Sequence, residues 1–233
     1  MTQLPIALPH RTAFGREDFL VASSNAEALF WIDRWPAWPS GVLLVHGPQS
    51  CGKTHLAHLW RERCGGMIVG PTELAARDVP TLLAAGRKGL AVDDAERAAE
   101  LQLLHLYNSC REEGTGLLLT ARRPPAAWPT ALADLRSRLL ATLAVEIGAP
   151  DDALLAAVLV KHFADRQLRV SAEAIGYLVP RMERSLAAAA TLADRLDAAA
   201  LAAKRPIGVA LARDVLAQDA AYRSSSPSKA GVT

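Results

Sequence analysis

Short apolar runs alternate with stretches of helical period over most of the chain. Each run is apolar almost without interruption, as expected for strands buried on both faces of a parallel sheet. The five predicted strands are Val42–Val45, Met67–Val69, Gly89–Asp94, Gly116–Thr120 and Leu143–Ile147. The predicted helices between them are His55–Arg63, Thr72–Ala76, Val79–Arg87, Ala98–Glu113 and Asp134–Leu139. This alternation predicts an α/β fold, in which helices flank a five-stranded parallel sheet.

A further helix is predicted before the first strand. Ser24 is followed three residues later by Glu27, which is the spacing of a capping box. We therefore expect a helix from about Asn25 to Arg34.

The pattern changes after Gly148, Ala149 and Pro150, because only helical periods follow. These predicted helices are Asp152–Arg166, Ser171–Val179, Ser185–Lys204 and Ile207–Ala221. We expect an α/β nucleotide-binding domain over residues 13–150 and a small all-helical lid domain over 151–222. Residues 1–12 form an extended segment with two prolines in this scheme, and residues 223–233 form a disordered tail by composition.

Composition narrows the class of protein. The chain is 51% hydrophobic and has a net charge of +2, so it can bury a full core and is not basic enough to indicate nucleic-acid binding by itself. Its three cysteines are odd in number and lack metal-ligand spacing, which favours a reducing, cytoplasmic setting. We expect no signal peptide and no membrane segment, since no apolar run approaches membrane length.

The first chemical motif is GPQSCGKT at Gly47–Thr54, which fits the phosphate-binding pattern G-x-x-x-x-G-K-[ST]. It lies between a predicted strand and a predicted helix, where backbone N–H groups and a helix N-terminus point at phosphates. Lys53 would contact the β- and γ-phosphates, and the Thr54 hydroxyl would ligate Mg²⁺. The predicted nucleotide contacts in and after this loop are Gly47, Pro48, Ser50, Cys51, Gly52, Lys53, Thr54 and His55. The cofactors expected are therefore ADP or ATP, with Mg²⁺.

Two acids follow the third predicted strand, about 40 residues after the loop. Asp93 is predicted to hold a metal-bound water, and Asp94 to orient an attacking water. Thr120 ends the fourth strand, at the edge where ligands bind in open α/β sheets. The sequence thus predicts a nucleotide site at the carboxyl edge of the sheet.

The N-terminal segment carries alternating apolar residues at Leu4, Ile6 and Leu8, with Gln3 before them. One interpretation is a frayed terminus. The other is a short linear peptide that inserts apolar side chains into a groove on a partner.

These features together resemble an AAA+ ATPase, and in detail the branch of the bacterial replication initiator DnaA. DFLVASSN resembles the box that cradles adenine in that family, which implies contacts from Phe19, Leu20, Val21 and Asn25. GKTHLAH, LAVDD, LLLTARRPP, DLRSRL and RPIGVALARDVL are similar to further family segments, so the resemblance covers residues 4 to about 221.

The N-terminal QLPIAL is similar to sliding-clamp-binding peptides, and no DNA-binding domain follows Ala221 in this sequence. This combination resembles the Hda family of DnaA-related regulators. The resemblance implies a cytoplasmic negative regulator of replication initiation that binds ADP, DnaA and the polymerase sliding clamp. Gln3, Leu4, Ile6 and Leu8 would bind the clamp. A homodimer or AAA+ oligomer is also implied, without strong direct DNA binding.

DLRSRL resembles the box that holds the arginine finger, which implies that Arg138 stabilises charge on a γ-phosphate across an interface. Arg136 is the alternative and would otherwise belong to that interface. Two positions depart from the DnaA pattern: Ala187 stands at the sensor-2 arginine, and Arg122 at an acidic position after sensor 1. Both departures predict weak or no intrinsic ATPase activity.

Two other functions remain open at this point. The intact loop, Asp93 and Asp94 also suit a self-hydrolysing AAA+ ATPase that acts on single-stranded DNA, as a helicase loader or an initiator paralogue. A small phosphoryl-transfer enzyme is a third interpretation, although no second-substrate motif is visible.

Overall fold

The computed structural model describes residues 15–225 and leaves 1–14 and 226–233 outside the description. The described residues form two compact units, each of which is built from several parts of the chain. The first unit contains residues 15–19, 28–45 and 53–145. The second contains residues 20–27, 46–52 and 146–225.

A five-stranded sheet forms the centre of the first unit. Its strands are β1 (Val42–His46), β2 (Met67–Val69), β3 (Leu90–Val92), β4 (Leu117–Ala121) and β5 (Leu143–Glu146). Their order across the sheet is β2-β3-β4-β1-β5. β3 pairs in parallel with β2 and with β4, in a register that puts Ala91 beside Ile68 and Leu118. The predicted parallel sheet is confirmed, with each strand within about two residues of its expected limits.

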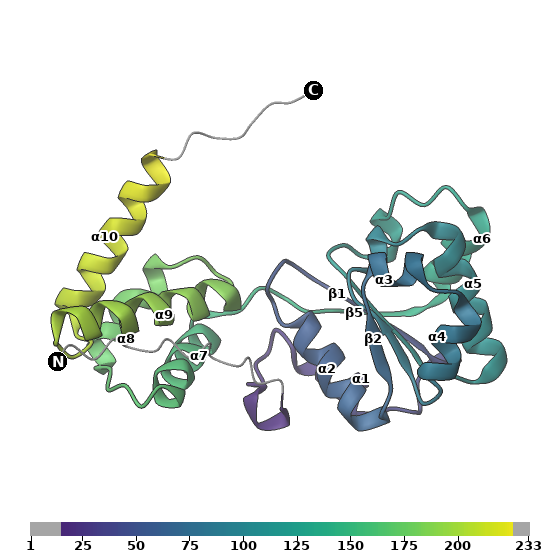
Figure 1. The fold of residues 1–233 in the computed structure, drawn as a ribbon, viewed down its shortest axis with the longest axis horizontal. Helices are drawn as coiled ribbons and strands as arrows, with labels where there is room; N and C mark the ends of the chain where they lie inside the picture. The colour runs from purple at the N-terminus through teal and green to yellow at the C-terminus, as the bar shows by residue number, and fades with distance from the viewer. Residues whose placement is uncertain (1–14, 226–233) are drawn as a thin grey trace, which may run out of the picture. The chain divides into compact units, whose positions relative to one another are not determined.

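Helices cover the sheet of the first unit on both faces, as Figure 1 shows. Helix α2 contacts β2, β3 and β4, whereas α3 and α4 pack against α5 on the other face. The helices of this unit are α1 (Ala26–Asp33), α2 (Lys53–Cys64), α3 (Pro71–Ala76), α4 (Val79–Ala85), α5 (Glu100–Glu113) and α6 (Ala133–Ala141). This arrangement follows from strands that have apolar residues on both faces, because each face then needs a helical cover.

The core of the first unit is formed by the strand residues and the inner helix faces. Val42, Leu44, Leu90, Val92 and Leu117 are fully buried in it. Burial of such side chains contributes roughly 1.5–3 kcal/mol each. The sheet is therefore a rigid base for the residues that follow the carboxyl ends of its strands.

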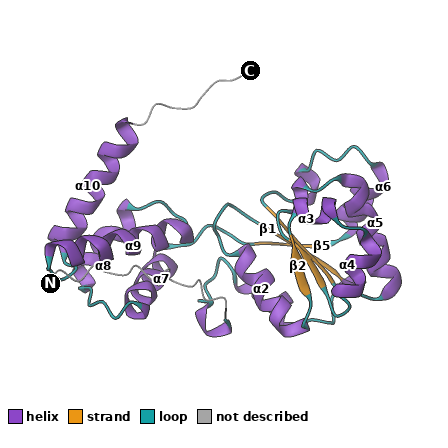
Figure 2. Cartoon of the chain, viewed as in Figure 1, coloured by secondary structure: helices purple, strands orange, loops and turns teal. Residues whose placement is uncertain are grey.

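The second unit is helical beyond residue 150, as the purple helices without strands in Figure 2 show. Its helices are α7 (Asp152–Asp165), α8 (Ala172–Leu178), α9 (Leu186–Ala203) and α10 (Val209–Ser225). Asp151, Ser171 and Ser185 cap the first three of these, each accepting a hydrogen bond from a backbone N–H three residues on. Phe163, Leu178 and Leu196 lie in the shared core. We call this four-helix part the lid.

The predicted capping box at Ser24 is wrong. The Ser24 hydroxyl is buried without a hydrogen-bond partner, and its carbonyl accepts from the Gly148 N–H at 2.9 Å. Asn25 shapes this turn instead: its Oδ1 accepts from the Ala22 N–H at 2.8 Å. An Asn side chain is long enough to close such a turn ahead of a helix, and α1 begins one residue later.

No helix among residues 15–225 combines the length and the apolar character needed to cross a membrane.

Candidate functional site

The phosphate-binding loop connects β1 to α2 and requires glycine at its first position. A Cβ on Gly47 would lie 2.1 Å from the backbone oxygen of Ile147, well inside van der Waals contact. The His46 carbonyl accepts from the Ile147 N–H at 2.7 Å, so the backbone that blocks a side chain is itself held in place. The turn continues through positive φ angles of 57° at Ser50 and 112° at Gly52. This backbone leads directly into the first turn of α2.

Lys53 and Thr54 begin α2, and the third predicted strand brings Asp93 to them. Lys53 is buried. The Thr54 hydroxyl donates to Asp93 Oδ2 at 2.8 Å. A hydroxyl and a carboxylate in contact are hard oxygen ligands of the kind Mg²⁺ takes alongside phosphate oxygens and water. Among the described residues, no three His, Cys, Asp or Glu side chains gather as a metal cage, so the fit is to an ion held largely by a nucleotide.

Thr120 ties the ends of β3 and β4 together. Its hydroxyl is fully buried, accepts from the Asp94 N–H at 3.1 Å and donates to Asp93 Oδ1. Asp93 is therefore held by Thr54 on one oxygen and by Thr120 on the other. Asp94 adopts a left-handed conformation with φ 53°, and its carboxylate stays one-third exposed with Arg97 4.0 Å away. The structure thus brings together the four residues predicted at this edge of the sheet.

The residues predicted to cradle adenine divide between the two units. In the first unit, Phe19 is buried and meets the His55 ring edge-on, with centroids 5.1 Å apart. In the second unit, Asn25 donates from Nδ2 to the Leu20 carbonyl at 2.9 Å, which fixes the loop. Val21, in contrast, is 54% exposed. Packing accounts for Phe19 and Asn25 without a ligand, whereas the exposed Val21 leaves an apolar surface available.

The three cysteines form no disulfide and are buried. Cys51 lies inside the loop at 2% exposure, consistent with a small filler. Burial raises the pKa of the Cys110 thiol to about 12, so that residue is an unreactive core side chain.

Arg138 lies on the last turn of α6 and is paired with Asp134 on the preceding turn. Its Nη2 donates to Asp134 Oδ2 at 3.2 Å. Its buried Nε contacts Oδ1 at 3.0 Å, but without the alignment of a hydrogen bond. The carboxylate therefore occupies the Nε/Nη2 edge of the guanidinium group. Within the described part of the chain, the Nη1 donors and the outer Nη2 hydrogen have no partner, and these are the donors a phosphate would use.

Helix α6 is anchored at both ends by residues of α5. The Glu100 carboxylate accepts from the backbone N–H groups of Ala131 and Leu132, at 2.9 and 2.8 Å, just before the helix. These bonds hold the pKa of Glu100 below its usual value. At the other end, Thr142 donates to the Arg138 carbonyl at 2.8 Å and shares a 3.0 Å hydrogen bond with the buried Tyr107 hydroxyl. The backbone under Arg138 is thus fixed from two directions.

Arg138 also lines a small cavity of about 280 Å³ with Asn108, Arg111 and Glu112 of α5. None of Lys53, Thr54 and Asp93 lines this cavity. Arg136, the alternative candidate, is exposed on the same helix. Arg138 is therefore half-buried at a cavity that none of these candidate nucleotide residues lines.

The lid places Ala187 in the first turn of α9, directly after the Ser185 cap. The Leu186 N–H donates to the Ser50 carbonyl at 3.0 Å, so this helix start and the tip of the loop are in contact. Arg184 does not take the sensor-2 position, because it pairs with Asp152 at 2.6 Å. The start of α9 therefore presents a methyl group where the DnaA pattern has a cation.

Two arginines follow β4. Arg123 pairs with Glu96 at 3.7 Å, and its backbone N–H donates to the same carboxylate at 3.3 Å. Arg122 is exposed and contacts no carboxylate among the described side chains. The acidic position of the DnaA pattern is thus occupied by a free cation.

Some contributors were not predicted from the sequence. Asp134 precedes Arg138 by four residues, a spacing at which helical ion pairs form, and this signal was available. Glu100 bonds to a backbone N–H 31 residues away, and Tyr107 to a hydroxyl 35 residues away. No pattern in the neighbouring sequence predicts contacts over such separations. Gln3, Leu4, Ile6 and Leu8 lie outside the described residues.

Comparison with known families begins with the lid. A family model described as the Hda lid domain matches residues 151–216. Among known proteins, DnaA of Thermomicrobium roseum is 24% identical over 228 residues, which is 86% of this chain and 48% of that protein. DnaA of Sphingopyxis alaskensis is 27% identical over 229 residues, or 96% of this chain and 46% of that protein. The chain therefore spans about half the length of the relatives it matches.

Solved structures share the fold. Domain III of the Thermotoga maritima DnaA superposes with a TM-score of 0.75 at 16% identity, covering 88% of this chain and 96% of that one. AMPPCP-bound DnaA from Aquifex aeolicus gives a TM-score of 0.65 at 17% identity, covering 78% and 64%. The Thermotoga maritima RuvB branch-migration motor gives 0.62 at 19% identity, covering 76% and 61%. The lid match over residues 151–216, the DnaA relatives and the shared fold together support an Hda/DnaA-related AAA+ protein.

Proposed function

We propose that this protein is a cytoplasmic negative regulator of replication initiation, which binds ADP, is tethered to the sliding clamp, and supplies Arg138 to ATP bound on DnaA. The observation that carries the proposal is the position of Arg138. Its guanidinium has free donors and lines a cavity apart from Lys53, Thr54 and Asp93, so it is suited to a phosphate on a different molecule. The Hda lid match and the DnaA relatives support the same assignment.

The proposed chemistry is assistance to hydrolysis in trans. Water attacks the γ-phosphorus of ATP on DnaA, the bond to the β-phosphate oxygen breaks, and negative charge is redistributed over the transferring group. The free N–H donors of Arg138 stabilise that charge, as an arginine finger does. Asp134 orients the guanidinium, and the bonds from Glu100 and Thr142 hold its helix.

The nucleotide on this chain has a structural role in this proposal. Gly47–Thr54 and Asp93 would hold ADP or ATP with Mg²⁺, which neutralises phosphate charge when bound. Ala187 offers no donor to a γ-phosphate, so hydrolysis on this chain would be slow. The direct test is an assay of ATP hydrolysis on DnaA with clamp-loaded DNA: this protein should accelerate it, and an absence of acceleration would refute the proposal.

Asp134→Asn should impair the orientation of the Arg138 guanidinium with little effect on the free energy of unfolding. The amide keeps the size of the side chain but loses its charge and one acceptor, so the guanidinium is less well fixed. We expect stimulation of DnaA to fall by about 10- to 100-fold, the size of effect that small misplacements cause. Unfolding free energy should change by less than about 0.5 kcal/mol, because the pair is an exposed i,i+4 contact. Asp165→Asn, which breaks the matching i,i+4 pair with Lys161 in the lid, is the control and should leave stimulation intact.

Ala187→Arg should increase ATP hydrolysis by the isolated protein. The new guanidinium extends from the first turn of α9, which contacts the loop tip, and adds a donor for a developing charge. We expect at least about a tenfold higher single-turnover rate. Ala198→Arg, at an exposed position of the same helix, is the control for added charge. If both variants turn over ATP at the wild-type rate, the missing sensor-2 cation does not limit hydrolysis.

Gln3→Ala combined with Leu4→Ala should abolish clamp binding. Both residues precede the described residues 15–225, so the fold of the two units should be unaffected. We expect clamp affinity in a gel-filtration or interferometry titration to fall by at least about 30-fold, as for other anchor residues. Thr2→Ala is the neighbouring control. Clamp binding that survives the double change would contradict the peptide assignment.

One observation favours a second function. The Thr54–Asp93–Thr120 network is complete, as an ATPase that hydrolyses its own ATP would need. Arg122, two residues after Thr120, is an unpaired cation that could contact the phosphates of single-stranded DNA. One solved structure is of a DnaA bound to AMPPCP and single-stranded DNA. Binding of single-stranded DNA with a steep salt dependence, and ATP turnover stimulated by it, would favour this alternative.

A further inference from the structure

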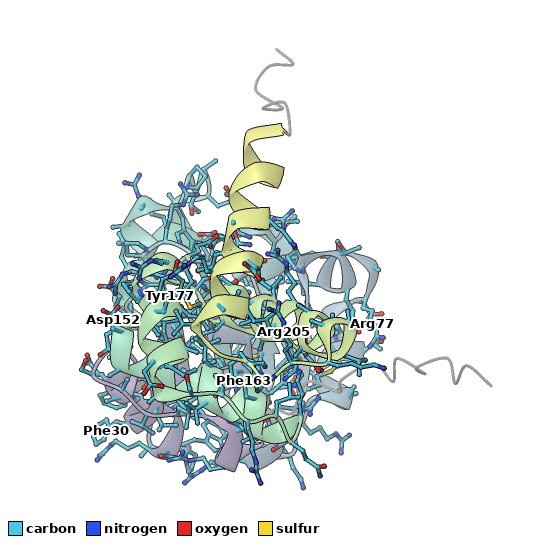
Figure 3. All side chains as sticks on the ribbon, turned by 90° about the vertical axis from the view of Figure 1, so that its left-hand side faces the viewer. Phe30, Arg77, Asp152, Phe163, Tyr177 and Arg205 are labelled. Carbon is cyan, nitrogen blue, oxygen red and sulfur yellow. The ribbon has the colours of Figure 1, made fainter. Side chains whose placement is uncertain are left out.

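A groove on the lid shares Ser50 and Ala187 with the nucleotide site proposed above, but the rest of its lining has no role in that function. It has a volume of about 770 Å³ and opens between α8, α9, α10 and the tip of the phosphate-binding loop. Figure 3 looks onto the lid, with Tyr177 labelled beside these helices. The residues that matter here are Tyr177, Arg181, Ala187, Thr191, Arg195 and Arg213, with Gln49 and Ser50 from the loop. We call it the lid groove.

The lid groove has an apolar floor made of short side chains. Ala187 and Thr191 are one helical turn apart on α9, and Leu216 and Ala217 face them from α10. Small residues at this spacing let another helix approach closely, while Leu216 offers apolar area to bury. The floor therefore suits a helix with an apolar face better than a polar small molecule.

The charged residues of the lid groove are mainly basic. Arg181, Arg195 and Arg213 come from three different elements, against a single acid, Glu183. Arg181 lies over the Tyr177 ring at 4.1 Å and donates to the Tyr177 carbonyl, and Arg195 donates to the Val215 carbonyl. Among the described side chains, neither Arg181 nor Arg213 contacts a carboxylate.

Three lid arginines away from the groove are different, whereas a fourth, Arg169, contacts no carboxylate among the described side chains. Each of the three has a carboxylate partner, in the pairs Arg166–Asp194, Arg184–Asp152 and Arg205–Asp214. The lid therefore contains enough acidic residues to pair with arginines. In the described structure, however, none of these acids pairs with Arg181 or Arg213. Uncompensated guanidinium groups around an apolar floor favour a ligand that brings both carboxylates and apolar side chains.

We propose that the lid groove is a docking site for an acidic amphipathic helix of a partner protein. The helix would lay its apolar face on Ala187 and Thr191 and direct its carboxylates at Arg181 and Arg213. Nucleic acid fits less well: Arg181 already covers the half-buried Tyr177 ring, which removes the stacking platform that single strands use. The inference does not depend on the role of Arg138.

Docking in the groove is coupled to the nucleotide. Gln49 and Ser50 line the groove, and Ser50 belongs to the phosphate-binding loop. The Ser50 carbonyl also accepts from the Leu186 N–H at the start of α9. A helix in the groove therefore contacts the loop that surrounds the phosphates, and each ligand must change the affinity of the other by the same factor.

The test uses the full chain, a fluorescein-labelled peptide of about 18 residues (five helical turns) built from Leu and Glu at helical period, and anisotropy as the readout. The wild type should bind this peptide and not the matching Leu/Lys peptide.

Arg213→Glu should weaken binding at least about tenfold, because it replaces attraction by repulsion. Arg169→Glu, an exposed lid arginine outside the groove, should bind like wild type. Titration with ADP should shift the peptide Kd, and the peptide should shift the ADP Kd equally.

Four results would overturn the proposal. The first two are that the Leu/Glu peptide does not bind, and that Arg169→Glu weakens its binding as much as Arg213→Glu does. The others are that single-stranded oligothymidylate displaces the peptide at a lower concentration than unlabelled peptide does, and that Arg213→Glu changes the oligomeric state in sedimentation. The last would make the occupant a second copy of this chain. A Kd that ADP leaves unchanged would overturn the coupling.

Discussion

Replacing Arg138 by alanine is expected to reduce clamp-dependent ATP hydrolysis on DnaA to the rate DnaA shows alone. An arginine finger contributes roughly 10³- to 10⁵-fold to the rate of phosphoryl transfer, because a fixed guanidinium meets charge that develops in the transition state. The alanine variant keeps Glu100, Thr142 and the fold of α6, so it removes the donors and little else. Single-turnover hydrolysis of labelled ATP preloaded on DnaA measures the effect.

Two further variants make this result specific. Arg138→Lys keeps the positive charge but loses the planar fork, so it should restore little of the stimulation. Arg136→Ala removes an exposed arginine from the same helix and should stay within a fewfold of wild type. Nucleotide binding by all three variants should be unchanged, since none of the residues lines the loop. If Arg136→Ala is the inactive variant, the finger is Arg136, and if neither is inactive, hydrolysis in trans has another source.

The strands and the chemistry at their carboxyl ends were predictable because the signals are local. Val42–Val45 is an uninterrupted apolar run, and the glycine and lysine spacing after it is specific to phosphate-binding loops. Asp93 and Thr120 could be expected near each other, since Asp93 follows β3 and Thr120 lies at the end of the adjacent parallel strand β4, and the hydroxyl of Thr120 does contact the Asp93 carboxylate. In a parallel sheet the carboxyl ends of all strands lie at the same edge, so residues far apart in the sequence meet there.

Contacts between distant parts of the chain were not predictable in the same way. Glu100 caps the turn before α6 from another helix, and its own neighbours give no sign of this use. Ser24 shows the opposite error: its spacing to Glu27 matches a cap, but the tertiary bond between its carbonyl and Gly148 holds the turn in another geometry. A local rule fails where a tertiary hydrogen bond competes for the same backbone.

Charge balance is a second property that only the structure reveals. The sequence has a net charge of +2, which predicts nothing about where arginines lack partners. In the lid, Arg184 and Arg205 find acids through folding, whereas Arg213 does not among the described side chains. The lid groove could therefore be located only after the helices were in place.

Gly47→Ala is expected to remove nucleotide binding and to destabilise the protein. The added Cβ would lie 2.1 Å from the Ile147 oxygen and 3.2 Å from the Cys51 sulfur. The first of these atoms is backbone and is held by the hydrogen bond between the Ile147 N–H and the His46 carbonyl. The loop must therefore move, and the N–H groups that would surround the phosphates move with it.

We expect ADP affinity, measured by calorimetry or fluorescent-analogue displacement, to fall on the order of 100-fold, as when binding groups are displaced by about 1 Å. Overpacking of this kind costs about 1–3 kcal/mol in unfolding free energy. Gly70→Ala is the matched control, because a Cβ there meets no atom within 4 Å and the backbone at Gly70 is extended.

The two readouts distinguish a local effect from general unfolding. Denaturant titration reports the free energy of unfolding, and ADP binding well below the midpoint reports the loop in folded molecules. If Gly47→Ala stays folded and binds ADP like Gly70→Ala, the loop does not hold the phosphates through its backbone. If it stays folded, loses ADP and still stimulates DnaA, then Arg138 acts without a nucleotide on its own chain. A loss of stimulation together with ADP binding would instead show that the nucleotide organises the lid and the interface for Arg138.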